Sequence, residues 1–167
     1  MKLREPATEK LREPATEPAL TETYVQLTRT VERLHRRHLD MLRFELDQLG
    51  IQDVSAAQVL MLTKIKEQSI SVRDLVERGY YLGSNASYNL KQLADCGLIE
   101  QERAAHDRRS TRVKLSAKGK ALCAKIAEAE QRHARAVAAA GDGQALSAAC
   151  QALRRVESAW GDYIRGA

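Results

Sequence analysis

Long apolar runs are missing from this 167-residue sequence, and cysteine is rare. No stretch approaches the roughly 20 apolar residues that a membrane span needs, and the N-terminus lacks the apolar core of a signal peptide. The three cysteines, Cys96, Cys123 and Cys150, are odd in number and far apart, which argues against a secreted disulfide framework. We therefore expect a cytoplasmic protein.

Aromatic residues are also scarce, at 4%, whereas alanine and leucine are abundant, and this mixture favours helices over sheets. The chain has the length of one domain and is long enough to bury a core. Its net charge of +5 points only weakly to an anionic partner, because many solvated proteins are this basic.

Proline is confined to the first 18 residues, where the octapeptide KLREPATE occurs twice, at 2–9 and at 10–17. A polar duplication that is interrupted by proline has little apolar surface to bury, so residues 1–18 are predicted to be a disordered tail. An arm that contacts DNA is the alternative, although the charges of the repeat nearly cancel.

Beyond residue 18, glycines mark the ends of the predicted elements. Apolar residues recur at helical spacing from Leu20 to Leu49 and stop at Gly50, which predicts a helix of about 30 residues. This length exceeds that of an ordinary globular helix, so we expect the helix to serve an interface. Ser55-Ala-Ala-Gln58 is a capping box that opens a second helix through about Glu67.

Two short helices and two strands follow. Ser71 to Asp74 opens a third helix that ends at Gly79, and a fourth begins at Gly83–Ser84 and ends at Cys96–Gly97. The strand-like segments are Leu98–Arg103 and Ser110–Leu115, separated by the polar turn AAHDRR. Ser116 then caps a long helix to about Ala140, and a last helix follows the Gly141-Asp-Gly143 break.

Two short helices joined by a tight turn and followed by a β-hairpin describe a winged helix-turn-helix. The expected fold class is mainly α (α+β), with long N- and C-terminal dimerisation helices around that unit. We expect a tail at 1–18, an N-terminal dimerisation helix at 19–50, a DNA-binding region at 51–116 and C-terminal dimerisation helices at 117–167.

The last helix carries an apolar stripe with spacings of three and four, formed by Leu146, Ala149, Leu153, Val156, Trp160 and Tyr163. An interhelical seam requires such spacing. The stripe could pack within one subunit, but we favour a homodimer.

The fourth predicted helix has the polarity of a DNA-reading helix. Ala86, Leu90, Leu93 and Ala94 fall on one apolar face at 100° per residue. Short polar donors near a helix N-terminus suit the base edges of the major groove. The residues predicted to contact DNA from the polar side are Ser84, Asn85, Ser87, Tyr88, Lys91 and Gln92. A polar outer face also describes most surface helices, so this face alone does not decide the function.

The hairpin that follows is basic. From Arg103 to Lys114 there are five cations (Arg103, Arg108, Arg109, Arg112 and Lys114) and one anion, Asp107. Arginines at a hairpin tip can enter a narrow minor groove, where the potential is most negative. Asp107 fits this picture if it fixes an arginine rotamer through a charge-assisted hydrogen bond. The alternative is a solvated basic turn.

Three segments together resemble the MarR family of regulators. DRRSTRVKLSAKG at 107–119 resembles the family's wing, with an Asp-x-Arg tip and a Leu-[Ser/Thr]-x-x-Gly start to the next helix. LGSNASYNLKQLADCGLIEQER at 82–103 resembles the reading helix and first strand, and LGIQDVSAAQVLML at 49–62 the start of the second helix. The resemblance covers Leu20 to Ala167, and YYLGSNASYNLKQL looks closest to the LdtR-like branch.

The resemblance implies a homodimeric transcriptional regulator, usually a repressor, on a palindromic operator of double-stranded DNA. It implies that Arg109 enters the minor groove, oriented by Asp107, while Arg108 and Arg112 contact phosphates. It also implies release by a small aromatic or phenolic effector between the dimer helices and the reading domain. The candidate pocket residues are His38, Leu42, Met61 and Ile65, which could instead be core.

Other chemistries are disfavoured. His35 and His38 have helical spacing, but the neighbouring Arg36 and Arg37 oppose a metal cation, so we expect no metal site and no cofactor. No nucleophile elbow or phosphate loop is present, so catalysis is not expected. The alternatives that stay open are a winged-helix protein-interaction module without DNA binding and a redox-responsive variant that uses a cysteine.

Overall fold

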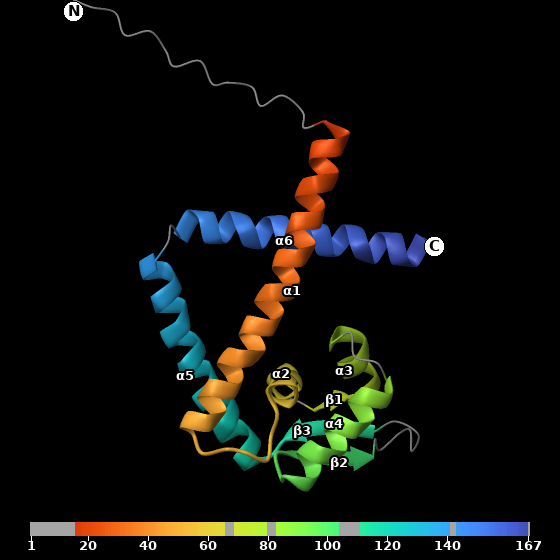
Figure 1. Ribbon diagram of the computed structural model, residues 1–167. Coiled ribbons are helices and arrows are strands. Elements are labelled where there is room, and N and C mark those ends of the chain that lie inside the picture. Colours follow the sequence, from red (N-terminus) through yellow and green to blue (C-terminus); the bar gives the residue numbers. More distant parts are fainter. Residues whose placement is uncertain (1–15, 66–68, 80–82, 104–110, 141–142, 167) are drawn as a thin grey trace, which may run out of the picture. The chain divides into compact units, whose positions relative to one another are not determined.

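The computed structural model describes residues 16–65, 69–79, 83–103, 111–140 and 143–166 (Figure 1). These residues belong to two compact units, which meet in sequence between Met41 and Leu42. Within the described residues the elements are α1 (Glu17–Gln48), α2 (Ala56–Lys64), β1 (Ile70–Ser71), α3 (Val72–Gly79), α4 (Gly83–Asp95), β2 (Ile99–Arg103), β3 (Thr111–Leu115), α5 (Ala117–Ala140) and α6 (Gly143–Gly166). This architecture confirms the predicted mainly α winged helix-turn-helix. No helix in the described ranges is long and apolar enough to cross a membrane.

Helix α1 starts earlier than predicted. It begins at Glu17, so Glu17 and Pro18, which the sequence assigned to the tail, are helical. Proline fits the first turn of a helix because its missing N–H would have no partner there, and Glu17 complements the positive end of the helix. The other end is as predicted, with Gly50 at φ +68°. Residues 1–15 of the predicted tail lie outside the described residues.

Helix α2 has the predicted cap and a shorter length. Ser55 Oγ accepts from the Gln58 N–H at 3.3 Å, and Gln58 Oε1 accepts from the Ser55 N–H at 2.8 Å. These two bonds confirm the capping box. The helix ends at Lys64 rather than Glu67, because Ile65 is already extended, at φ −81° and ψ 104°.

The sheet contains a strand that the sequence did not predict. Its order is β1-β3-β2, and both neighbours of β3 are antiparallel to it. β1 has only two pairs, Ile70↔Val113 and Ser71↔Arg112, and two residues cannot show a periodicity. Ser71 also starts α3 as predicted, since its Oγ accepts from the Asp74 N–H at 3.0 Å.

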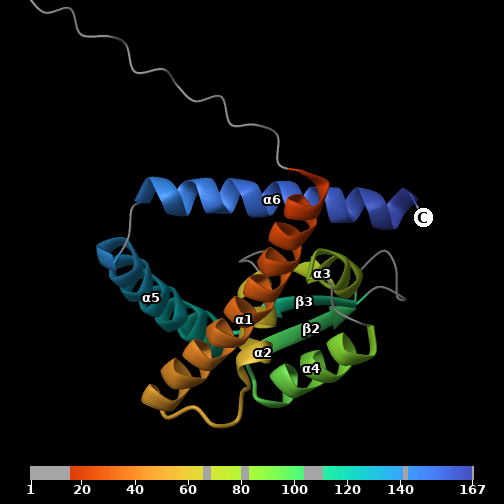
Figure 2. The same ribbon diagram turned by 45° about the horizontal axis from the view of Figure 1, so that its top comes forward.

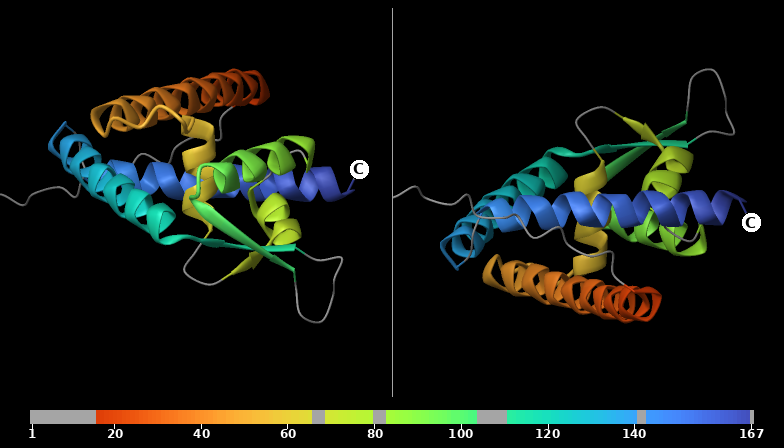
Figure 3. Two further views of the ribbon diagram at one scale, coloured as in Figure 1. Left: turned by 90° about the horizontal axis from the view of Figure 1, so that it is seen from below. Right: turned by 90° about the horizontal axis from the view of Figure 1, so that it is seen from above.

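The core of the second unit lies between α2, α4, α5 and the sheet. Helix α2 contacts α3, α4 and α5, and α4 packs along β2 (Figures 2 and 3). The predicted apolar face of α4 is buried at Ala86, Leu90 and Leu93, whereas Ala94 is only half-buried. The largest fully buried side chains are Met61, Leu62, Ile65, Leu75, Leu93, Leu98, Ile126, Val59 and Val113. Burial of this face fixes which side of α4 remains exposed.

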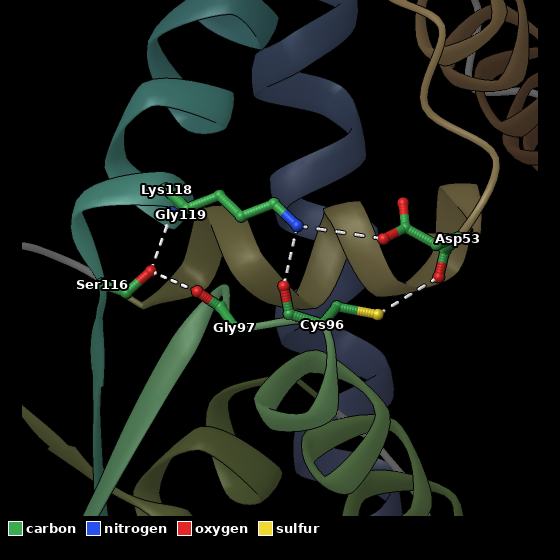
Figure 4. Close-up of polar contacts among 6 residues, drawn as sticks. All are labelled: Asp53, Cys96, Gly97, Ser116, Lys118 and Gly119. Carbon is green, nitrogen blue, oxygen red and sulfur yellow. Dashed lines mark hydrogen bonds and ion pairs between the residues drawn. The ribbon is translucent and has the colours of Figure 1, made fainter.

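Helix α5 begins against the backbone that leaves α4 (Figure 4). Ser116 Oγ accepts from the Gly119 N–H at 3.0 Å, which confirms the predicted cap, and donates to the Gly97 carbonyl at 2.6 Å. The Ser116 N–H donates to the Leu98 carbonyl at 3.0 Å. A Cβ on Gly119 would lie 2.0 Å from that carbonyl oxygen, so only glycine fits this position.

We expect Gly119→Ala to lower the free energy of unfolding by about 2 kcal/mol, because the added methyl must push α5 away from the Leu98 carbonyl. Urea unfolding measures the change. Gly143→Ala is the matched control, since a Cβ there meets nothing within 4 Å, and it should unfold like the wild type. Equal midpoints for the two variants would contradict the close approach.

Candidate nucleic-acid interface

The exposed face of α4 carries most of the residues predicted to read DNA. Asn85, Ser87, Tyr88 and Lys91 are exposed, and Gln92 is half-buried. The Tyr88 side chain is 63% exposed, which core packing does not explain. Ser84 is the second residue of α4, but its side chain lies outside the described part. The structure therefore brings a row of polar side chains and one aromatic ring together on a helix whose opposite face is buried.

A groove of about 630 Å³ runs along the side of α4, between α3 and the sheet. It is lined by Val72, Arg73, Ser87, Leu90, Lys91, Ala94, Asp95, Gln101 and Thr111. Arg73 is held by Glu77, at 2.9 Å from Nε to Oε1, whereas Lys91 forms no ion pair with another described residue. The charge of Lys91 is thus available beside the exposed face of α4.

The strands of the predicted wing are present, and its tip is not described. β2 and β3 pair in register from Ile99↔Leu115 to Arg103↔Thr111, which confirms the hairpin. Segment 104–110 joins these two strands and includes Asp107, Arg108 and Arg109, so these three predicted DNA contacts lie outside the described residues. Their roles remain predictions.

The two cations of β3, Lys114 and Arg112, are engaged within the chain. Lys114 Nζ lies 3.2 Å from Glu100 Oε2 and also bonds to Glu102 Oε1. Hydrogen bonds to Glu102 and Glu100 raise the pKa of the Lys114 ammonium group. The predicted local charge excess counted Lys114 but left out these glutamates. The antiparallel register places Glu100 directly across from Lys114, and Glu102 across from Arg112, two residues away on the same strand. The hairpin strands are therefore less basic than the sequence of 103–114 indicated.

Arg112 also bonds within the chain. Its Nε donates to Ser69 Oγ at 2.9 Å, and its Nη2 donates to the Ser69 carbonyl. The guanidinium thus lies at the segment before β1. These bonds compete with the predicted contact between Arg112 and a DNA phosphate.

The predicted effector residues are divided between the two units. Leu42, Met61 and Ile65 have relative exposures of 3%, 0% and 2% and belong to the core of the second unit. His38 is half-buried in α1, within the first unit. Core packing accounts for the three apolar residues, and a ligand pocket at these positions stays a prediction.

Sequence reasoning missed a buried carboxylate at the end of α1. Glu45 accepts from Arg132 Nη2 at 2.8 Å and lies 2.8 Å from His133 Nε2, with both partners on α5. Its side chain is 8% exposed. The available signal was a glutamate between Leu42 and Leu46 on the apolar side of the helix. Its partners satisfy its hydrogen bonds, so it joins two helices. No cluster of three metal-ligating side chains occurs among the described residues.

The cysteines differ in their surroundings. Burial raises the pKa of the Cys96 thiol, and the negative charge of Asp53 adds to the effect. The Cys96 Sγ donates to the Asp53 carbonyl at 3.4 Å (Figure 4). Burial also raises the pKa of Cys123, and Cys150 is exposed on α6. Because the thiolate is the reactive form, these shifts oppose redox sensing by Cys96 or Cys123.

Comparison with known proteins gives a consistent set of relatives. The pattern described as MarR family matches residues 49–110. The Exopolysaccharide II synthesis transcriptional activator ExpG of Rhizobium meliloti (strain 1021) is 43% identical over 144 residues, which cover 86% of this chain and 74% of that protein.

Two solved structures have the same fold as this chain. The transcriptional regulator BldR from Sulfolobus Solfataricus has a TM-score of 0.70 at 19% identity, covering 83% of this chain and 96% of its own. A MarR mutant from E. coli complexed with operator DNA has a TM-score of 0.70 at 21% identity, covering 82% of this chain and 97% of its own. At these identities the likeness concerns the fold.

We expect the alkylation rate of Cys96 to rise at a higher pH than that of an ordinary thiol. The reason is that its raised pKa reduces the fraction of thiolate at any given pH. Mass spectrometry of iodoacetamide-treated protein over a pH series gives the rate for each cysteine. Glutathione in the same tube is the reference. A Cys96 midpoint at or below that of glutathione would contradict the assigned environment.

Proposed function

This chain belongs to the MarR family of transcriptional regulators, and on that premise we propose that it binds a palindromic DNA operator as a homodimer. The observation that carries the proposal is the exposed polar face of α4, with Tyr88 at its centre, beside a two-stranded hairpin. A helix of this kind fits the major groove when the hairpin reaches the neighbouring minor groove.

In the proposed complex the polar residues among the first ten of α4 contact the DNA. Asn85 is suited to bidentate contact with adenine, and Tyr88 offers a hydroxyl and an apolar ring. Ser84, Ser87, Lys91 and Gln92 complete the contact face. The burial of Ala86, Leu90 and Leu93 supports this role, since it holds the helix in one rotational setting.

The hairpin tip supplies the minor-groove contact. We place Arg109 in the groove, Asp107 beside it as the residue that orients the guanidinium, and Arg108 on a phosphate. Support comes from the engagement of Lys114 with Glu100 and Glu102, which leaves the tip as the more basic part of the hairpin. The E. coli MarR mutant of the same fold is described as complexed with operator DNA.

The proposed dimer uses the long helices at 19–50 and 117–167, around a DNA-binding region at 51–116. Helix α6 has 24 residues, and none of them is buried within its own chain. Its apolar stripe is therefore exposed as well, with Leu146 at 49%, Leu153 at 36% and Trp160 at 40%. An amphipathic helix with an exposed stripe fits a partner helix. A two-fold dimer then predicts half-sites about one helical turn apart.

Two modes of regulation are candidates. The first is repression, released by a small aromatic or phenolic effector that prefers a dimer unable to bind DNA. His38, Leu42, Met61 and Ile65 are its proposed pocket. The second is activation, which is favoured by the name of the relative that is 43% identical, an activator of exopolysaccharide II synthesis. A reporter with the operator placed over or upstream of the promoter separates repression from activation.

The wing and the reading helix should respond differently to mutation. We expect Arg109→Ala to weaken operator binding about 10- to 100-fold, because a minor-groove contact is lost. Asn85→Ala should reduce the preference for the operator over random duplex more than it reduces binding to random duplex. Fluorescence anisotropy with both duplexes, over a range of salt concentrations, measures these quantities.

Lys120→Ala removes an exposed cation from α5 and is the control, with wild-type affinity expected. A wild-type affinity that does not fall with salt would favour the protein-interaction alternative, since phosphate contacts make binding strongly salt-dependent. An equal loss for Asn85→Ala on both duplexes would remove the base-reading role.

The dimer seam has its own test. We expect Leu153→Asp to give a monomer that has lost operator binding, because it places a charge within the apolar stripe. Sedimentation measures the mass. Gln151 is exposed on the opposite side of α6, so the Gln151→Glu protein should stay dimeric. A dimeric Leu153→Asp protein would show that the stripe is not the interface.

A further inference from the structure

We infer that Arg112 is a positioning residue that fastens the second hairpin strand to the start of α3, and that it is not a phosphate contact. The inference rests on the proposed DNA binding, because its consequence is that the wing and the helix-turn-helix meet the operator in one fixed arrangement. It assigns to Arg112 a partner within the chain, Ser69, in place of the DNA backbone.

The contact uses two donors of one rigid group. Nε of Arg112 donates to the Ser69 hydroxyl at 2.9 Å, while Nη2 donates to the Ser69 carbonyl. The planar fork of a guanidinium can satisfy both acceptors at once, which an ammonium group cannot reproduce with the same geometry. Both residues are half-buried, so water competes less for these bonds than it would at a fully exposed site.

The position of Ser69 gives the contact its importance. Ser69 precedes β1, the strand with only two residues, and the second of these, Ser71, caps α3 through the Asp74 N–H. Two residue pairs are a weak attachment for a strand on which a helix start depends. The two bonds from Arg112 therefore strengthen substantially the attachment of β3 to the segment from Ser69 to Ser71.

The neighbouring carboxylates do not account for the direction of Arg112. Glu102 is its register partner on β2, but Glu102 bonds to Lys114 instead. Among the described residues no ion pair joins Arg112 to a carboxylate. The guanidinium turns to the other edge of β3, towards β1, where its acceptors are neutral and where it links the hairpin to the helix-turn-helix.

The test compares variants of the donor, Arg112, with variants of the acceptor, Ser69. Arg112→Lys retains the charge and loses the fork, whereas Arg112→Gln loses both. We expect each to weaken operator binding about tenfold, the effect of losing a bond to a charged group. The slope of log affinity against log salt should stay as in the wild type. Ser69→Ala should weaken binding about threefold, and Ser69→Thr, which keeps the hydroxyl, should restore it.

Further readouts separate positioning from a general loss of stability. Hydroxyl-radical protection should weaken at the flanks of the operator and persist over the half-site centres. The double variant Arg112→Gln/Ser69→Ala should bind like Arg112→Gln alone, because both changes break one contact. Lys91→Gln is the control for a cation proposed to contact DNA, and it should make the salt slope shallower by about 0.9 if it contacts one phosphate.

Near-wild-type binding by Arg112→Lys, together with a shallower slope for Arg112→Gln, would overturn the inference and restore the phosphate contact. Additive effects of the two residues would also overturn it. If the wild type itself does not bind duplex DNA, the proposed function fails. The Arg112–Ser69 contact is then tested by urea unfolding of the wild type, Arg112→Gln, Ser69→Ala and the double variant. Additive changes in the free energy of unfolding would refute the contact.

Discussion

The carbonyl group of Leu98 is the point on which the arrangement of the second unit depends. The Leu98 N–H donates to Leu93 at the end of α4, and the Leu98 carbonyl accepts from Ser116 at the start of α5. Gly119 allows α5 to approach this backbone closely. Lys118 adds a third connection, since its Nζ donates to the Cys96 carbonyl at 2.8 Å and lies 3.9 Å from Asp53, just before α2 (Figure 4). The end of α4, the start of α5 and the segment before α2 are thereby connected at residues 96–98.

This junction explains how a small sheet can support α4, the proposed reading helix. Among the described residues the sheet has three strands, one of them only two residues long, so its own hydrogen bonds are few. The orientation of α4 comes instead from its buried apolar face and from the fixed chain reversal at Gly97, where φ is +69°. The two cations of β3 serve the same end. Lys114 is bound by Glu100 and Glu102 across the hairpin, and Arg112 by Ser69.

Local features of this fold could be predicted from the sequence, and distant ones could not. The caps at Ser55, Ser71 and Ser116 depend on residues three positions away, and the ends at Gly50 and Gly97 depend on single glycines. The polar face of α4 followed from helical periodicity. By contrast, Arg112 and Ser69 are 43 residues apart, and Glu45 and Arg132 are 87 apart. Such pairs are set by tertiary packing, and so was the two-residue strand β1.

The same distinction bears on the proposed dimer. The core of the second unit is confined to the end of α1, helices α2 to α5 and the sheet, while α6 contributes no buried residue. The buried Glu45 bridge fixes the end of α1 to Arg132 and His133 in the second half of α5. In the proposed dimer these helices set the separation of the two reading helices, and α4 sets only what each one reads. Operator spacing and operator sequence would then be determined by different parts of the chain, so a change in the Glu45 bridge could alter the first while the second is kept.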